Sequence, residues 1–161
     1  MNYLNDMETG KLELKDIAGY LPYELSFTSG DNPGFIHKAL QLSLDSVFGK
    51  YKPILRPISD LHKPVAHNGK GIIPVLELAK IARPELDWGL IGYTAHYKDE
   101  ITFLYVEDVF ILYSRFTGHR PIPNQRQLFD YMDELKLDYR GLIDAGLAIS
   151  VYDLEANNPY K

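Results

Sequence analysis

The spacing of apolar positions changes along the chain, which predicts helices and strands within one domain. The clearest helical pattern covers residues 125–135, where apolar residues recur at i, i+1, i+4 and i+7 and form one stripe on a helix face. We expect the acidic residues between them to be solvated. The apolar positions are Leu128, Phe129, Met132 and Leu135, and the acidic positions are Asp130, Asp133 and Glu134.

Polar residues that commonly cap helices flank this pattern. Asn124 stands at its start and Gln127 follows three residues later, which is the spacing of a capping box. Asp138 is placed to cap a second, shorter helix over Tyr139–Ala145, and Gly146 is placed to end it in a left-handed conformation. A short strand, 147–149, and a last turn capped by Ser150 are predicted after it. We expect Leu142 and Ile143 to be buried together with the apolar stripe.

A hairpin and a helix are predicted in the middle of the chain. Asn68-Gly69 lies between two short extended segments and is typical of a type I′ turn, in which both central residues have positive φ. Pro74 favours the first position of a helix, because its φ is fixed and its missing N–H is not needed there. We expect that helix to run to about Ala82, before Pro84.

The remaining segments alternate between extended and short helical patterns. Three strands of an antiparallel meander are predicted, followed by a Pro-rich loop from Thr117. For 38–45 a half-buried strand is predicted, with a helix as the alternative. The meander strands are Trp88–Tyr97, Ile101–Val106 and Val109–Phe116; the other elements are a helix over Leu14–Leu21, a strand over Leu25–Thr28, a turn over 29–34 and an extended segment over Lys52–Pro57. The fold class is therefore α+β: a single compact domain over residues 1–161, with short antiparallel hairpins, a meander and about four short helices.

Composition narrows the class of protein. The 161 residues include no Cys, which excludes disulfides and thiolate chemistry, and the net charge of −5 argues against general nucleic-acid binding. The start of the chain is polar, and no run approaches the roughly 20 apolar residues of a membrane span. We therefore expect a soluble protein of the cytoplasm that does not bind membranes.

The charges are unevenly distributed. Residues 46–76 hold five bases against Asp60 alone, and no acid occurs between Asp108 and Asp130. These two basic segments could form one anion-binding face, or they could pair with acidic segments of the same fold. The candidate anion-contacting residues are Arg56, Lys63, Arg115, His119, Arg120 and Arg126.

No established catalytic or metal-binding motif occurs in the chain. His62 and His67 straddle a predicted hairpin start and have poor spacing for metal ligands. His96 beside Asp99 and Glu100 could form an acid–base pair, but an outward-facing strand histidine is the simpler interpretation. We therefore predict no catalytic residues, no metal and no cofactor.

Several stretches together resemble a known family. They are KLELKDIAGYLPYEL (11–25), KPILRPISDL (52–61), NGKGIIPVLELAKI (68–81) and QLFDYMDELKLDYRGLIDAGLAISVYDLEANNPYK (127–161). They resemble short uncharacterised proteins encoded by phages and prophages of gut Bacteroides-type bacteria. The resemblance implies a location in the bacterial host cytoplasm and an accessory rather than a virion-building role, and it carries over no catalytic residue.

The leading hypothesis is a non-enzymatic phage or prophage accessory protein that binds a host or phage protein. Inhibition of a bacterial defence system is one form that this role could take. The 12 Tyr residues suit a recognition surface, although they also suit the strands of a small domain. Two alternatives remain open: a binder of nucleotide or nucleic acid through segments 46–76 and 115–126, and an enzyme without a recognisable motif.

Overall fold

The computed structural model describes residues 10–29, 31–38, 48–154 and 158–161 as a mixed α+β fold, which confirms the predicted class. Its elements form a four-stranded sheet, a five-stranded sheet and a two-stranded hairpin. The helices are α1 (Leu14–Ile17), η1 (Leu21–Tyr23), η3 (Ile58–His62), α3 (Pro74–Ala82), α4 (Gln125–Glu134) and η4 (Val151–Asp153). In the described part of the chain no helix is long and apolar enough to cross a membrane.

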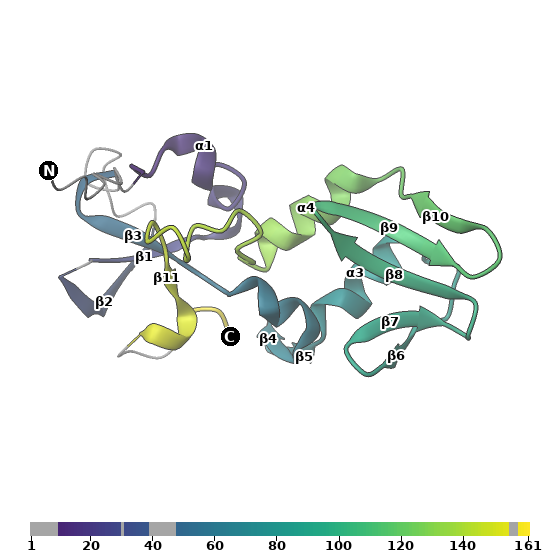
Figure 1. Ribbon diagram of the computed structural model, residues 1–161. Coiled ribbons are helices and arrows are strands. Elements are labelled where there is room, and N and C mark those ends of the chain that lie inside the picture. The colour runs from purple at the N-terminus through teal and green to yellow at the C-terminus, as the bar shows by residue number, and fades with distance from the viewer. Residues whose placement is uncertain (1–9, 30, 39–47, 155–157) are drawn as a thin grey trace, which may run out of the picture.

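The four-stranded sheet joins segments from both ends of the described chain. Its order is β11-β3-β1-β2, in which β11 runs parallel to β3 and the other neighbours are antiparallel. Figure 1 shows this sheet at one end of the molecule and the five-stranded sheet at the other, with α4 between them. The strands are β1 (Ser26–Ser29), β2 (Asn32–Lys38), β3 (Tyr51–Leu55) and β11 (Ile149–Ser150).

The five-stranded sheet is an antiparallel meander with two more strands than the sequence predicts. The segment 88–97 divides because Gly92, with φ of 62°, opens a two-residue turn. The predicted Pro-rich loop supplies an edge strand, where the missing N–H of Pro121 does not interrupt a ladder. The strands, in sheet order, are β10 (Gly118–Pro121), β9 (Val109–Ser114), β8 (Ile101–Val106), β7 (Thr94–Tyr97) and β6 (Gly89–Ile91).

Two local predictions are confirmed. Asn68 and Gly69 have φ of 49° and 74° and join β4 (Val65–His67) to β5 (Lys70–Ile72), as expected for a type I′ turn. The helix α3 begins at Pro74 and ends at Ala82.

The apolar residues form two clusters. The larger lies between α3, α4 and one face of the five-stranded sheet, and it includes Phe103, Phe110 and Leu128. The smaller packs α1 against the four-stranded sheet, and Tyr139 contacts both clusters. The single cluster predicted for the C-terminal region is therefore divided: Leu128, Phe129 and Met132 belong to the larger cluster, and Leu142 and Ile143 to the smaller.

The region after α4 differs most from its prediction. Residues 139–145 form turns rather than a helix, because Gly141 adopts a positive φ of 72° in the middle of the segment. The Asp138 carboxylate still accepts hydrogen bonds from the N–H groups of Leu142 and Ile143, both at 2.8 Å. Gly146 has the predicted positive φ, and the Ser150 hydroxyl accepts from the N–H of Tyr152.

Two polar residues of α4 also behave differently. Asn124 occupies the N-cap position, but its side chain makes no cap bond; its Nδ2 donates to the carbonyl of Ile81 at 3.3 Å and to Oε1 of Gln127 at 3.2 Å. Asp133, predicted to be solvated, is buried and accepts from the hydroxyl of Tyr139 at 2.8 Å. Burial raises the pKa of the Asp133 carboxyl.

Other boundaries are corrected slightly. The predicted helix 14–21 is present only over Leu14–Ile17, where Ile17 is buried and Leu14 is exposed. The C-terminal strand lies at Ile149–Ser150 instead of 147–149. The predicted strand 38–45 falls largely on 39–47, which lies outside the described residues.

Candidate functional site

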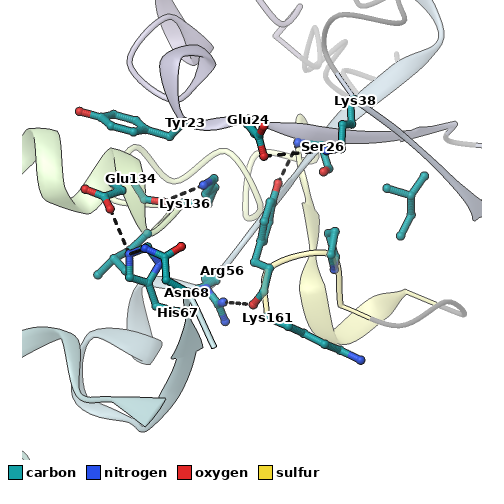
Figure 2. Close-up of a pocket in the computed structure, with 14 residues that line it drawn as sticks. Tyr23, Glu24, Ser26, Lys38, Arg56, His67, Asn68, Glu134, Lys136 and Lys161 are labelled. Atoms are coloured by element: carbon teal, nitrogen blue, oxygen red, sulfur yellow. Dashed lines mark hydrogen bonds and ion pairs between the residues drawn. The ribbon is translucent and has the colours of Figure 1, made fainter. Parts of the chain in front are cut away.

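A cavity of about 430 Å³ lies where the two halves of the fold meet. Its walls come from the start of β1, the end of β2, the turn between β4 and β5, the end of α4 and the last described residues (Figure 2). Most of its lining side chains are polar or charged. They are Tyr23, Glu24, Ser26, Ile36, Lys38, Arg56, His67, Asn68, Glu134, Leu135, Lys136, Pro159, Tyr160 and Lys161.

Tyr160 is fixed in the cavity wall by two hydrogen bonds of its hydroxyl. The hydroxyl donates to the carbonyl of Ile54 at 2.7 Å and accepts from the N–H of Ser26 at 3.0 Å. Burial raises the pKa of this phenol, so it stays neutral. Its ring lies 5.1 Å from Nζ of Lys136 and 5.8 Å from Cζ of Arg56, within range of a cation–π interaction with each.

Lys136 lies just beyond Leu135, the C-cap residue of α4, and is held by hydrogen bonds of its own backbone. It has a left-handed φ of 56°, its N–H donates to the carbonyl of Asp133 at 3.0 Å, and its carbonyl accepts from the N–H of Arg56 at 2.8 Å. These contacts turn the side chain into the fold, where it is only 9% exposed and Nζ donates to the carbonyl of Glu134 at 2.8 Å. Burial lowers the pKa of Lys136, and the positive charge of Arg56 lowers it as well.

Arg56 lies beside Lys136, on the segment that leaves β3, and is 3% exposed. Its Nη2 donates to the carbonyls of Ala66 at 2.8 Å and Tyr160 at 2.5 Å. Burial lowers the pKa of the guanidinium, while the nearby charge of Asp60 opposes that shift. The Nε atom is buried without a hydrogen-bond partner.

The two carboxylates of the cavity lie beside other basic side chains. Oε1 of Glu134 lies 3.0 Å from Nε2 of His67, and Oε2 of Glu24 lies 3.8 Å from Nζ of Lys38. Within the described ranges, neither Arg56 nor Lys136 has a carboxylate oxygen at ion-pair distance. The cavity therefore contains two buried cationic side chains that the charges of Asp60, Glu24 and Glu134 reach only from beyond ion-pair distance.

The residues selected from the sequence as anion contacts are distributed over the molecule. Arg56 reaches the cavity, whereas Lys63 lies on the surface, 4.0 Å from Oδ1 of the buried Asp60. Arg115 packs on the ring of Phe116 beside the β9–β10 hairpin, and the His119 ring packs on Tyr113. Arg120 lies on β10 and Arg126 in the first turn of α4, both exposed. In Figure 1, β10 and β3 lie at opposite ends of the molecule, so the hairpin residues do not join Arg56.

The sequence pattern gives no sign of Lys136 or Tyr160 as site residues. Both reach the cavity through contacts distant in sequence, with Ile54, Ser26 and Arg56. The other histidines have ordinary contacts: Nδ1 of His96 lies 3.0 Å from Oγ1 of Thr102. In the part of the chain that the structure covers, no group of three His, Cys, Asp or Glu residues could hold a metal ion.

Comparisons of this chain with protein families, with curated proteins and with solved structures gave no significant match.

Proposed function

We propose that the protein binds a small anionic molecule, a carboxylate or phosphate compound, in the cavity beside Lys136 and Arg56. The observation that carries this proposal is the burial of both cations without a carboxylate partner among the described residues. Buried charges in proteins are nearly always paired, because removal of an ion from water is costly. A bound anion would supply the missing partner.

The neighbouring groups support an anion rather than a cation as the occupant. Both cavity acids, Glu24 and Glu134, already have basic partners. The Tyr160 ring and the carbonyl of Glu134 hold Nζ of Lys136 at the wall, so the ammonium is positioned before a ligand arrives. Positioned donors lose less conformational entropy on binding than free surface lysines do.

Calorimetric titration tests this proposal. The wild-type protein is titrated with inorganic phosphate, succinate and adenosine monophosphate at low and at physiological salt. We expect at least one to bind at low salt and to bind more weakly as salt rises, because the contact is between charges. An absence of binding by all three at low salt would contradict the proposal.

A pair of variants locates the binding site. Lys136→Met should weaken binding about tenfold or more, because a hydrogen bond to a charged group contributes about 1.5–3 kcal/mol. Lys80→Met is the matched control, since Lys80 lies on the surface of α3, paired with Glu77 at 2.8 Å. An equal loss of anion affinity in the two variants would show that the anion binds outside the cavity.

The five-stranded sheet favours a second candidate function, binding of a protein partner. Phe103, Phe110 and Leu112 face the helices, so the alternate residues of β8 and β9 point the other way. Val106 and Val109 form a cross-strand pair on that outer face and are 48% and 43% exposed. An open apolar sheet face of this kind suits a protein contact. The outer face also carries Leu104, Ile111 and Tyr113.

This second function is tested by affinity capture from a bacterial lysate. The double variant Val106→Lys, Val109→Glu places opposite charges across the strand pair and should keep the sheet folded. A protein that binds the outer face should no longer be captured by this double variant, and Lys136→Met should still capture it. If neither variant captures the protein, the outer face is not its specific contact.

A phage accessory protein active in the bacterial cytoplasm, including one that inhibits a host defence system, would fit either function. Both functions are non-enzymatic, and binding of a small anion also agrees with the nucleotide-binding alternative raised by the basic segment 46–76, since Arg56 belongs to it. Coupling between the two would be measured as a change in partner affinity when the anion is added.

A further inference from the structure

We propose that Lys136 forms a reversible imine with the carbonyl group of its ligand, so that the ligand is a small aldehyde or keto compound that also carries a carboxylate or phosphate. This inference rests on the proposed anion binding and adds a covalent step to it. Lys136 supplies the amine, Arg56 supplies the charge that holds the anionic group, and both residues line the cavity.

The position of the Lys136 amine is suited to attack on a ligand. Its Nζ is held by the carbonyl of Glu134 at 2.8 Å and by the face of the Tyr160 ring. In its neutral form the amine has two N–H groups, which these two contacts can accept, and one lone pair. That lone pair is the nucleophile that can attack a ligand carbonyl. Figure 2 shows the amine among the side chains of the cavity.

Lys136 differs from the other lysines in its surroundings. It is the only buried lysine among the residues that the structure describes. Burial and the charge of Arg56 both lower the pKa of its amine, which increases the neutral fraction near pH 7. The titratable and charged groups around the cavity are Tyr23, Glu24, Lys38, Arg56, His67, Glu134, Tyr160 and Lys161, and Glu24 and Glu134 oppose the lowering.

The chemical step is balanced without any further reactant. The Nζ lone pair attacks the carbonyl carbon, the C=O π electrons move to oxygen, and a proton passes from nitrogen to that oxygen to give a carbinolamine. Loss of the hydroxyl group as water, with one proton, forms the C=N bond. Amine and carbonyl compound thus give imine and water, and hydrolysis reverses the step. Arg56 would pair with the carboxylate or phosphate of the ligand, which directs the carbonyl to Lys136.

The experiment is reductive trapping with sodium cyanoborohydride followed by peptide mass mapping. The full chain is incubated near pH 7 with limiting glyoxylate, an aldehyde that carries a carboxylate. We expect Lys136 to be labelled several-fold faster than Lys80, because its lowered pKa increases the fraction of neutral amine and Arg56 can hold the carboxylate of glyoxylate beside it. Propionaldehyde, which has no anionic group, should label Lys136 more slowly than glyoxylate. Glyoxylate label spread evenly over the lysines, or equal labelling of Lys136 by both aldehydes, would overturn the proposal.

Two controls separate this inference from anion binding itself. Lys136→Arg keeps the positive charge and should lose the label while it still binds oxalate, an anion of similar size without an aldehyde. Binding of oxalate by the wild-type protein without labelling of Lys136 by glyoxylate would overturn the imine and leave the anion site standing. If oxalate does not bind and Lys136 is not labelled, both proposals are wrong. Urea unfolding of each variant confirms that it is folded.

Discussion

A Cβ atom on Gly19 would overlap Oδ2 of Asp133, so the buried carboxylate leaves no room for a side chain at that position. Gly19 follows α1 and Asp133 belongs to α4, and their close approach brings the N-terminal segment against the helix that leads to the cavity. The contact requires glycine for space rather than for its φ.

Gly19→Ala should therefore destabilise the protein. Either the backbone or the Asp133 carboxylate must move, which would disturb its hydrogen bond with Tyr139, and overpacking of this kind costs about 1–3 kcal/mol. Gly89→Ala is the control, because no atom lies within 4 Å of a Cβ at Gly89. Urea denaturation measures both variants. Equal stability of Gly19→Ala and wild type would show that the approach is looser than described.

Asn124 offers a test of how α4 begins. If its side chain accepted a cap bond, Asn124→Asp would be tolerated or stabilising. Because Nδ2 instead donates to the carbonyl of Ile81 and to Gln127, an aspartate would place a carboxylate against two oxygens. We expect Asn124→Asp to lower the free energy of unfolding by about 1–3 kcal/mol.

The control for this prediction adds the same charge to the same turn. Gln127→Glu keeps an acceptor for Asn124 and should be neutral or slightly stabilising near the helix N-terminus. Thermal and urea unfolding of the two variants would be compared. A more stable Asn124→Asp protein would restore the capping-box interpretation.

The turn between β4 and β5 predicts a third pair of variants. Gly69 has φ of 74°, so Gly69→Ala should cost about 1 kcal/mol or more in stability. Gly71, two residues later on β5, has no positive φ and no atom within 4 Å of a Cβ, so Gly71→Ala should be close to neutral. Because Asn68 and His67 line the cavity, Gly69→Ala should also weaken anion binding.

Alkaline pH should destabilise the protein through its buried and half-buried tyrosines. Burial raises the pKa of Tyr131 and of Tyr139 to about 12, and it also raises the pKa values of Tyr20, Tyr105 and Tyr160. A phenol whose pKa is higher in the folded state stabilises that state below its usual value of 10.0. This stabilisation is lost as the pH rises from about 10 through about 12. The lowered pKa of Lys136 acts in the opposite sense, but only up to its ordinary value of 10.5.

The loss of stability at alkaline pH can be measured by urea unfolding at increasing pH, together with phenolate absorbance. Tyr131→Phe is the informative variant, because no described residue makes a hydrogen bond with the Tyr131 hydroxyl. The free energy of unfolding of Tyr131→Phe should equal that of the wild type at neutral pH and should fall less than that of the wild type above pH 10. An unchanged alkaline profile in Tyr131→Phe would show that its phenol ionises as freely as one in water.

Features set by neighbouring residues were predictable from the sequence. The Asn68-Gly69 turn and the start of α3 at Pro74 depend on local φ preferences, and both occur as expected. The burial of Asp133 was not predictable, because its partner Tyr139 and its close neighbour Gly19 lie outside the helical pattern that predicted a solvated face. The prediction of a helix over 139–145 was wrong because Gly141 has a left-handed conformation, which the spacing of apolar residues does not reveal.

The cavity was the least predictable feature. Arg56 was selected as an anion contact for its place in a basic segment, and it does line the cavity. In the sequence, Lys136 is one charged residue among several near the end of a predicted helix, and its burial depends on its backbone contact with Arg56 and on the Tyr160 ring. Such a site arises from segments that are far apart in the chain, for which local sequence patterns give no signal.

The parallel pairing of β3 with β11 affects the order in which the chain can fold during its synthesis. Strand β3 is complete once Leu55 has left the ribosome, but its neighbour on one side contains Ile149 and Ser150. Each pair in the five-stranded sheet, in contrast, joins strands adjacent in the chain. That sheet can therefore form on the nascent chain while one edge of β3 still lacks its partner. During this interval β3 is the edge to which a chaperone, or a second nascent chain, would bind.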